Sequence, residues 1–259
     1  MTKYSVAQMR EGYTQKKEWE KQFPVSYFIF RPLSFYLASF LTNFTNSPSA
    51  TAYAGFFIGV SGSGLLFFSG TAGIWPGWGL LAFYALLDAA DGNIARATKN
   101  VTYYGKFLDG TLGIIAEGLY LPCLAAGLYL DGTGSYITNG LPGLAPAGLV
   151  AAAFLALTGL LYSARIEAGY DYHAVQKEKA EGTFSGTLTA VIGSSRFRDN
   201  LVYRLFINLN AFNVQLLLLA AAALFRAVDI FILLLAAYYA VRFLVCAVYY
   251  LAQASRRLC

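Results

Sequence analysis

The distribution of charge decides what kind of protein this chain forms. From Pro32 to Leu87, 56 consecutive residues include no Asp, Glu, Lys or Arg, and residues 132–164 and 205–225 also carry no charge. Apolar stretches of about 18 residues or more are typical of membrane-spanning helices. Only 13% of all residues are charged, whereas a soluble domain has about 25%. The pattern excludes a soluble globule, a disordered chain and a disulfide-bonded secreted domain, and it predicts an all-α, polytopic membrane protein.

Six apolar segments reach membrane-spanning length, so we expect six transmembrane helices. They lie at about residues 50–69, 74–95, 106–130, 141–164, 209–227 and 229–251. Residues 27–44 mix aromatic with small polar residues, which indicates an amphipathic helix in the membrane interface; a seventh span is the alternative. The expected organisation is a cytoplasmic arm with this interfacial helix (residues 1–48), followed by a six-span membrane domain (residues 49–259).

The basic residues follow this topology. Of the 19 Lys and Arg residues, 17 fall in the amino-terminal arm, the second-to-third and fourth-to-fifth connections and the carboxyl-terminal tail. Arg226 alone lies on the opposite side, and Arg242 falls inside the last expected span. The asymmetry indicates that both termini face the cytoplasm. We expect the protein to lie in the cell inner (cytoplasmic) membrane. The net charge of +5 therefore reflects membrane orientation, and we expect no nucleic acid as a partner.

Small residues recur in the first expected span. Gly55, Gly59, Gly62 and Gly64 follow one another at short intervals. Such small-residue patterns let two helix backbones approach closely, so we interpret these glycines as helix-packing positions and not as a ligand site.

Three acidic residues flank the second-to-third connection. Asp88 and Asp91 stand one turn apart near the end of the second span, and Asp109 lies near the start of the third. If the chain turns near Asn100, then Asp91 and Asp109 lie at similar depth, with Asp88 facing Gly113 about a turn deeper. Carboxylates in a membrane segment are costly and usually functional, and hard oxygen ligands suit Mg²⁺, Mn²⁺ or Ca²⁺. Water-exposed helix ends or an ion path are the alternatives.

The same segment carries a longer motif. Residues 88–109 read Asp-x-x-Asp-Gly-x-x-Ala-Arg, eight residues, Gly, three residues, Asp. This motif resembles the signature of the CDP-alcohol phosphotransferases, also called CDP-alcohol phosphatidyltransferases. The resemblance covers about residues 27–251 and includes three shorter segments: Arg31-Pro32-Leu33-Ser34, Thr45-Asn46-Ser47-Pro48 and Tyr162-Ser163-Ala164-Arg165-Ile166-Glu167.

The resemblance implies a membrane transferase of phospholipid or related lipid biosynthesis. Such an enzyme moves a phosphoryl group, often lipid-linked, from a CDP-linked donor such as CDP-diacylglycerol to an acceptor, with release of CMP. By resemblance, the protein binds Mg²⁺ (or Mn²⁺), contacts membrane lipids and forms a homodimer. The implied site residues are Asp88, Asp91 and Asp109 for the metal, Gly92, Ala95, Arg96 and Gly105 for the CDP moiety, and Arg165 for the acceptor or a phosphate.

One position departs from the family motif. Gly113 stands where the family carries a fourth aspartate that serves as metal ligand and general base. Glu117, one turn further along, is a possible substitute base because helical side chains lean toward the amino terminus of their helix. The other two explanations are an acceptor that is already ionised, such as a phosphate or phosphonate, and a non-catalytic protein that binds a CDP-linked nucleotide or lipid. The resemblance also implies two divalent ions at these carboxylates. We expect the second metal position to be weak or empty, because the carboxylate opposite Asp88 is missing and Glu117 reaches that position imperfectly.

Overall fold

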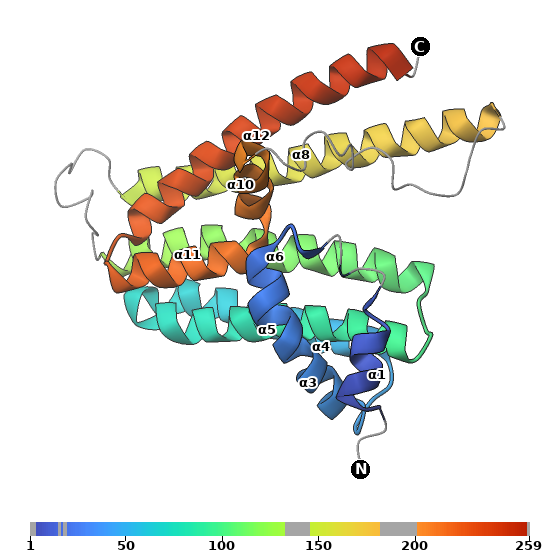
Figure 1. The fold of residues 1–259 in the computed structure, drawn as a ribbon. Coiled ribbons are helices and arrows are strands. Elements are labelled where there is room, and N and C mark those ends of the chain that lie inside the picture. The colour runs from blue at the N-terminus through green and yellow to red at the C-terminus, as the bar shows by residue number, and fades with distance from the viewer. Residues whose placement is uncertain (1–3, 15–16, 18–19, 133–145, 182–200, 258–259) are drawn as a thin grey trace.

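The computed structural model describes residues 4–14, 17, 20–132, 146–181 and 201–257, and every element in these residues is a helix. Two elements are not α-helices: the π-helix η1 (Ser26–Phe30) and the 3-10 helix η2 (Gly70–Gly73). The others are α1 (Val6–Glu11), α3 (Arg31–Leu41), α4 (Pro48–Phe68), α5 (Ile74–Ala97), α6 (Tyr103–Asp131), α8 (Pro146–Ala180), α10 (Leu201–Asn210), α11 (Phe212–Leu224) and α12 (Val228–Arg257). Figure 1 shows their arrangement.

Four of the described helices, α4, α6, α8 and α12, are long and apolar enough to cross a membrane. The pair α10 and α11 is bent by 81° and adds a fifth crossing if it forms one broken span. The predicted class, an all-helical polytopic membrane protein, is therefore confirmed. Helix α5 has 24 residues, about 36 Å of helix, but its two aspartates and its Trp, Pro and Gly residues lower its mean hydropathy. The count of six spans stays a prediction.

Two of the expected spans differ most from the structure. The fourth span was expected to end at residue 164, but α8 continues to Ala180. Beyond that boundary its polar residues find partners: Glu167 pairs with Arg242 of α12 at 2.9 Å, and the Tyr170 ring packs against Tyr250. The fifth span was expected to run unbroken over residues 209–227, whereas α10 ends at Asn210 and α11 begins at Phe212. Residues 141–145 of the fourth expected span lie outside the described part of the chain.

The interfacial segment is helical, as predicted. Helix α3 buries Ser34, Phe35 and Ala38 and exposes Tyr36 and Phe40. Helix α3 follows η1 without a break, and neither is among the described helices that are long and apolar enough to cross a membrane. Its place in the membrane interface stays a prediction. The amphipathic pattern fits a helix with one face on the protein and one on the membrane interface.

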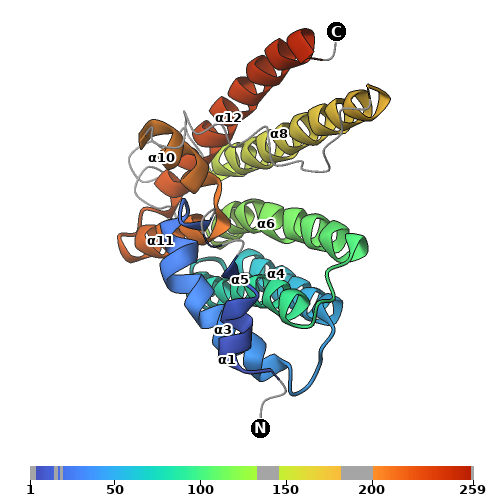
Figure 2. The same cartoon turned by 45° about the vertical axis from the view of Figure 1, so that its right-hand side comes forward.

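Helices α4, α5 and α6 pack as a unit, and α6 also contacts α8, which pairs with α12 (Figures 1 and 2). The predicted packing role of the glycines is confirmed at three positions. A Cβ atom at Gly59 would lie 3.0 Å from the Tyr84 ring, and one at Gly62 would lie 3.0 Å from the Gly77 carbonyl oxygen, while one at Gly55 would meet Leu87 at 3.3 Å. Gly64 has no such neighbour within 4 Å and is not part of this contact.

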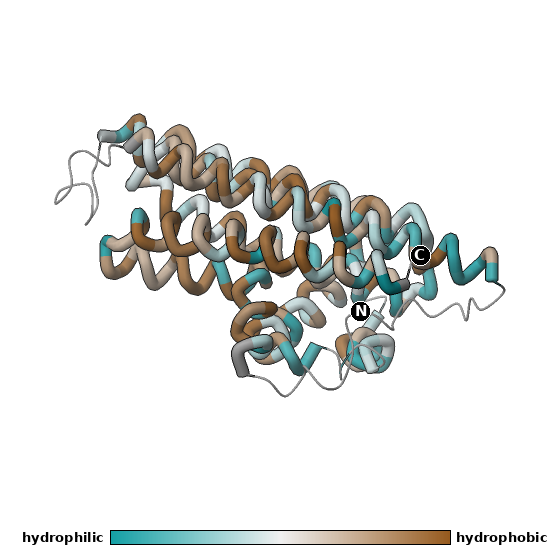
Figure 3. Tube along the Cα trace, turned by 90° about the horizontal axis from the view of Figure 1, so that it is seen from above, coloured by the Kyte–Doolittle hydropathy of each residue, from teal (hydrophilic) through white to brown (hydrophobic). Residues whose placement is uncertain are grey.

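The amino-terminal arm packs on the same unit, because α1 contacts both α3 and α5. Its Met9 and Tyr13 are buried in a small cluster with Phe35 of α3 and Ile94 of α5. Figure 3 shows hydrophobic residues along most of the long helices, while hydrophilic residues gather toward the end where both termini are marked. The arm therefore covers the polar end of α5, which carries the acidic motif.

Candidate active site

The hairpin between α5 and α6 brings the three motif aspartates together. Asp88 and Asp91 lie on α5 and Asp109 lies on α6, and each offers one carboxylate oxygen that is within 4.8 Å of the other two. Helix α6 begins directly after Thr102, whose hydroxyl accepts a hydrogen bond from the backbone N–H of Gly105 at 2.9 Å. The turn thus lies where the sequence analysis expects it, and the predicted convergence of the aspartates is found.

Two cavities meet at this acidic cluster. The first, the Glu117 cavity, has a volume of about 340 Å³ and is bordered by Glu20, Arg31, Asp88, Glu117 and Asn213, among others. The second, the Gly105 cavity, has a volume of about 620 Å³ and is bordered by Ala95, Asn100, Tyr104, Gly105 and Lys106, among others. Asp91, Gly92, Arg96 and Asp109 border both cavities. All four residues that the resemblance assigns to the CDP moiety therefore lie along the Gly105 cavity.

Gly92 makes room for the Arg96 guanidinium. A Cβ atom at Gly92 would lie 3.3 Å from each of the two terminal nitrogens of Arg96. One of these nitrogens, Nη2, donates to Asn93 Oδ1 at 2.7 Å, whereas the buried Nε has no hydrogen-bond partner in the structure. The guanidinium therefore lies where the two cavities meet and retains an unused donor, which suits an anionic ligand.

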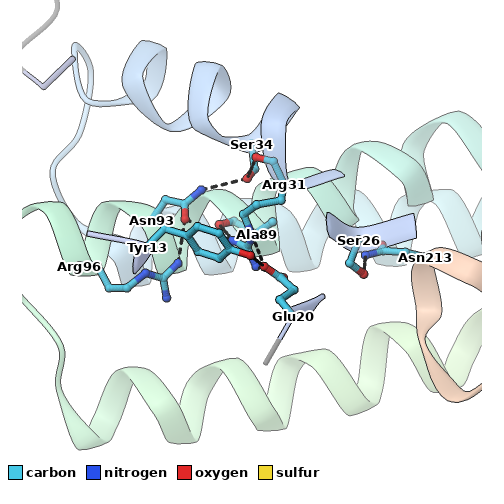
Figure 4. Close-up of polar contacts among 9 residues, drawn as sticks. All are labelled: Tyr13, Glu20, Ser26, Arg31, Ser34, Ala89, Asn93, Arg96 and Asn213. Carbon is cyan, nitrogen blue, oxygen red and sulfur yellow. Dashed lines mark hydrogen bonds and ion pairs between the residues drawn. The ribbon is translucent and has the colours of Figure 1, made fainter. Parts of the chain in front are cut away.

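Asn93 connects the motif helix to the amino-terminal arm (Figure 4). Its side chain is fully buried. The amide oxygen accepts hydrogen bonds from Arg31 Nη1 at 3.2 Å and from Arg96 Nη2 at 2.7 Å, and the amide nitrogen donates to Ser34 Oγ at 2.9 Å. One amide therefore holds both guanidiniums, so Asn93 links Arg96 to Arg31.

Arg31 is itself held by Glu20 of the arm. Its Nε donates to Glu20 Oε2 at 2.8 Å, its Nη2 pairs with the other carboxylate oxygen, and both side chains are less than 10% exposed. The Tyr13 hydroxyl donates to the same carboxylate, and the Arg31 guanidinium lies 4.9 Å from the centre of the Tyr13 ring. Burial, together with this hydrogen bond, raises the pKa of Tyr13, so the phenol remains a donor at neutral pH. The arm thus forms one wall of the Glu117 cavity.

The predicted substitute base lies beside the cluster but not within it. Glu117 borders the Glu117 cavity together with Asp88 and Asp109, yet it is not one of the three carboxylates within 4.8 Å of one another. The space beside Gly113 is open, since a Cβ atom there would meet only the Tyr84 hydroxyl, at 3.8 Å. A third, small cavity of about 10 Å³ joins Gly113 and Tyr84 to the three aspartates.

Arg165 lies apart from the cluster. Its side chain on α8 is exposed, and it borders none of the three cavities described above. In the same segment, Glu167 is linked to the site through other side chains. It pairs with Arg242, and Arg242 also donates to Asn210. Asn210 borders the Glu117 cavity.

The sequence pattern does not predict several residues that lie at the site. Glu20 is one of many polar residues in the arm, and Asn93 occupies an unspecified position of the motif. Phe212 and Asn213 reach the Glu117 cavity because the chain bends between α10 and α11, whereas an unbroken span was expected. Tyr84 had a usable signal, since it precedes Asp88 by four residues and so shares its helix face.

The family can now be assigned. The family model described as CDP-alcohol phosphatidyltransferase matches residues 45–256, which include the whole α5–α6 hairpin and all residues that border the Gly105 cavity. A search of curated proteins found no match to the sequence. The family consists of membrane transferases that move a phosphatidyl group from a CDP-alcohol in lipid synthesis. With more than half of its length matched, the chain belongs to the CDP-alcohol phosphatidyltransferase family.

Proposed function

We propose that this protein moves a lipid-linked phosphoryl group from a CDP-linked donor, such as CDP-diacylglycerol, to an alcohol or anionic acceptor, with release of CMP. The observation that supports this most directly is the acidic cluster at the meeting point of two cavities. One cavity is then available for the CDP-linked donor and the other for the acceptor. We further propose that the protein is a homodimer of the cell inner membrane, with six spans and both termini in the cytoplasm.

The site fits a divalent cation. Three carboxylate oxygens within 4.8 Å of one another form the hard, anionic ligand set that Mg²⁺ and Mn²⁺ prefer. The buried Tyr84 hydroxyl beside them has no hydrogen-bond partner in the structure, as expected where a ligand or an ordered water belongs. Asp88, Asp91 and Asp109 would hold the ion. A cation bound there supplies charge neutralisation for the diphosphate.

The Gly105 cavity suits the CDP moiety. Gly92, Ala95 and Gly105 have at most a methyl side chain, so the walls that they form leave space for a nucleotide. The Arg96 guanidinium faces both cavities and is a suitable donor for the diphosphate. Two Asn93-linked guanidiniums, those of Arg96 and Arg31, border the Glu117 cavity together with the aspartates.

The Glu117 cavity suits the acceptor. In the proposed reaction, Glu117 takes the proton from the acceptor hydroxyl, whose oxygen then bonds to the phosphorus that carries the donor group. The bond from that phosphorus to CMP breaks, and CMP leaves with the electron pair. An anionic acceptor that is already ionised needs no base and has Arg31 in the same cavity as its partner. Arg165, which is exposed, is proposed only as a contact for acceptor or lipid phosphate near the membrane surface.

Gly113 supports a second candidate function. Loss of the motif carboxylate removes a base that is typically worth about 10²–10⁴-fold in rate. A protein of the same fold that binds a CDP-linked nucleotide or lipid without the transfer reaction is therefore the alternative.

Thermal unfolding of the purified protein tests the proposal. CMP or CDP-diacylglycerol with Mg²⁺ or Mn²⁺ should stabilise the wild type by about 2.7 kcal/mol at a hundredfold excess over Kd. Asp91→Asn and Asp109→Asn should abolish the metal-dependent part, because each removes one of the three carboxylates. Asp131→Asn, at the opposite end of α6, is the matched control and should respond like the wild type.

The outcomes separate the two functions. Metal-dependent binding with release of CMP from the donor supports the transferase. Metal-dependent binding without any CMP release favours the binding protein. An equal response of wild type, Asp91→Asn and Asp109→Asn would show that the acidic cluster is not the metal site.

A further inference from the structure

The Tyr84 hydroxyl is a buried polar group at this site that the proposed reaction does not use. Tyr84 is 3% exposed, and its hydroxyl is buried without a hydrogen-bond partner in the structure. Its ring is held in place by close contact with Gly59 of α4 and by an edge contact with Phe212, whose ring centre lies 5.7 Å away. These contacts fix the orientation of the ring, and the ring orientation fixes where the hydroxyl lies.

That place is the space left by Gly113. Tyr84 Oη would lie 3.8 Å from a Cβ atom at Gly113, and apart from the chain neighbours of Gly113 and the helix backbone no other atom lies within 4 Å of that position. The small cavity there, about 10 Å³, is close to the minimum that holds one water molecule. Its polar borders are Tyr84, Asp88, Asp91 and Asp109, and its other borders are small or apolar. A water there has the two to four polar partners that a buried water requires.

We propose that Tyr84 and one water in this space replace the carboxylate that the family motif carries at the position of Gly113. The water lies between the Tyr84 hydroxyl and the aspartates, and it offers an oxygen ligand on the side of the cation site where the fourth aspartate is missing. Tyr84 is thus a positioning residue, which acts through the water. The inference rests on the proposed cation site at the three aspartates.

The chemistry of the replacement explains why it is partial. A water is a neutral ligand, whereas a carboxylate adds a negative charge, so a cation bound here is held less tightly than by four aspartates. A magnesium ion usually keeps several waters in its coordination shell, so the exchange of a carboxylate for a water is compatible with binding. Residues behind the ligand shell influence metal affinity strongly because they orient the ligands.

Direct titration of purified protein with Mn²⁺, followed by the electron paramagnetic resonance signal of the free ion, tests the inference. Tyr84→Phe keeps the ring and removes only the hydroxyl, and it should lower Mn²⁺ affinity about tenfold. Without metal, its midpoint of thermal unfolding should be unchanged or higher, because the lost hydroxyl has no protein partner. Tyr120→Phe is the matched control: its hydroxyl donates to Gln215 at 2.7 Å, so it should lower the unfolding midpoint and leave Mn²⁺ affinity unchanged.

Variants at Gly113 provide an independent measurement. Gly113→Ala places a methyl group in the water space and should lower Mn²⁺ affinity about as much as Tyr84→Phe. Gly113→Asp puts a carboxylate there and should raise the affinity. In the Gly113→Asp background, Tyr84→Phe should change Mn²⁺ affinity by less than about twofold, because the carboxylate then displaces the water.

The results distinguish this inference from the proposed function. Mn²⁺ binding by wild type with equal affinity in Tyr84→Phe and Gly113→Ala overturns the role of Tyr84 and leaves the cation site in place. No Mn²⁺ binding by the wild type overturns both. A lower unfolding midpoint of metal-free Tyr84→Phe at unchanged Mn²⁺ affinity shows a purely structural hydroxyl and also overturns the inference.

Discussion

Replacing Asn93 by alanine tests how the amino-terminal arm supports the site. The substitution removes an amide that makes three hydrogen bonds: two from the guanidiniums of Arg31 and Arg96, and one to Ser34. Hydrogen bonds to charged groups contribute about 1.5–3 kcal/mol each, and neutral ones about 1 kcal/mol. The sum is an upper bound, because Arg31 keeps Glu20 and the Ala89 carbonyl as partners and both guanidiniums border a cavity that water can enter.

We therefore expect Asn93→Ala to lower the free energy of unfolding by about 2–4 kcal/mol. For a chain of this size, 1 kcal/mol corresponds to about 2–4 °C in the midpoint of thermal unfolding, so the midpoint should fall by about 5–15 °C. Asn93→Asp keeps an oxygen acceptor for both guanidiniums and should lose less. Affinity for CMP should fall in Asn93→Ala because Arg96 loses its partner.

The assay is thermal unfolding in detergent, followed by Trp fluorescence, with CMP binding measured on the same samples. Asn43→Ala is the matched control, because Asn43 is exposed and its amide bonds only to the nearby Phe40 carbonyl; its midpoint should change little. If Asn93→Ala unfolds within 2 °C of Asn43→Ala, the network does not stabilise the arm. If it is destabilised but binds CMP like the wild type, the network does not position Arg96.

Two further predictions concern the reaction and the packing of the spans. If Glu117 is the base, Glu117→Gln should lower turnover with a neutral alcohol acceptor at least about a hundredfold; unchanged turnover would leave an ionised acceptor as the better explanation. Gly127→Ala should destabilise the fold by about 1–3 kcal/mol or more, because its Cβ atom would lie 1.9 Å from the Leu66 carbonyl oxygen. Gly64→Ala, with no atom of another residue in the way, should be neutral or slightly stabilising, and equal midpoints for the two variants would contradict the close contact of α4 and α6.

The acidic cluster was predictable because its geometry is local. Asp88, Asp91 and Asp109 lie within one helical hairpin, where the helical repeat determines which side chains share a face. The turn is set by residues next to it, since Thr102 caps the amino terminus of α6 shortly after α5 ends at Ala97. The neighbouring positions Gly113 and Glu117 follow from the same repeat, so their approach to the cluster could be expected as well.

The bend between α10 and α11 was not predictable from the hydrophobic pattern. Breaking a helix in a membrane frees backbone groups that must find new partners. Here the partners come from distant or non-adjacent side chains: Gln215 Nε2 donates to the Leu209 carbonyl at 2.9 Å, and the Tyr238 hydroxyl donates to the Phe206 carbonyl at 2.9 Å. Arg242 also donates to Asn210 at the break. The pattern of apolar residues does not indicate which distant side chains will bond to these backbone groups.

The sequence by itself determined that the chain is a helical membrane protein, because long uncharged segments must satisfy their backbone hydrogen bonds internally. It also determined that three carboxylates meet, because helix geometry relates residues a few turns apart. Only the tertiary structure decided which residues enclose them. Arg31 reaches Asn93 across 62 positions of the chain, and Tyr84 faces Gly113 from another helix. Such pairs depend on how whole helices pack, and packing is determined by the sum of many contacts instead of by any local run of residues.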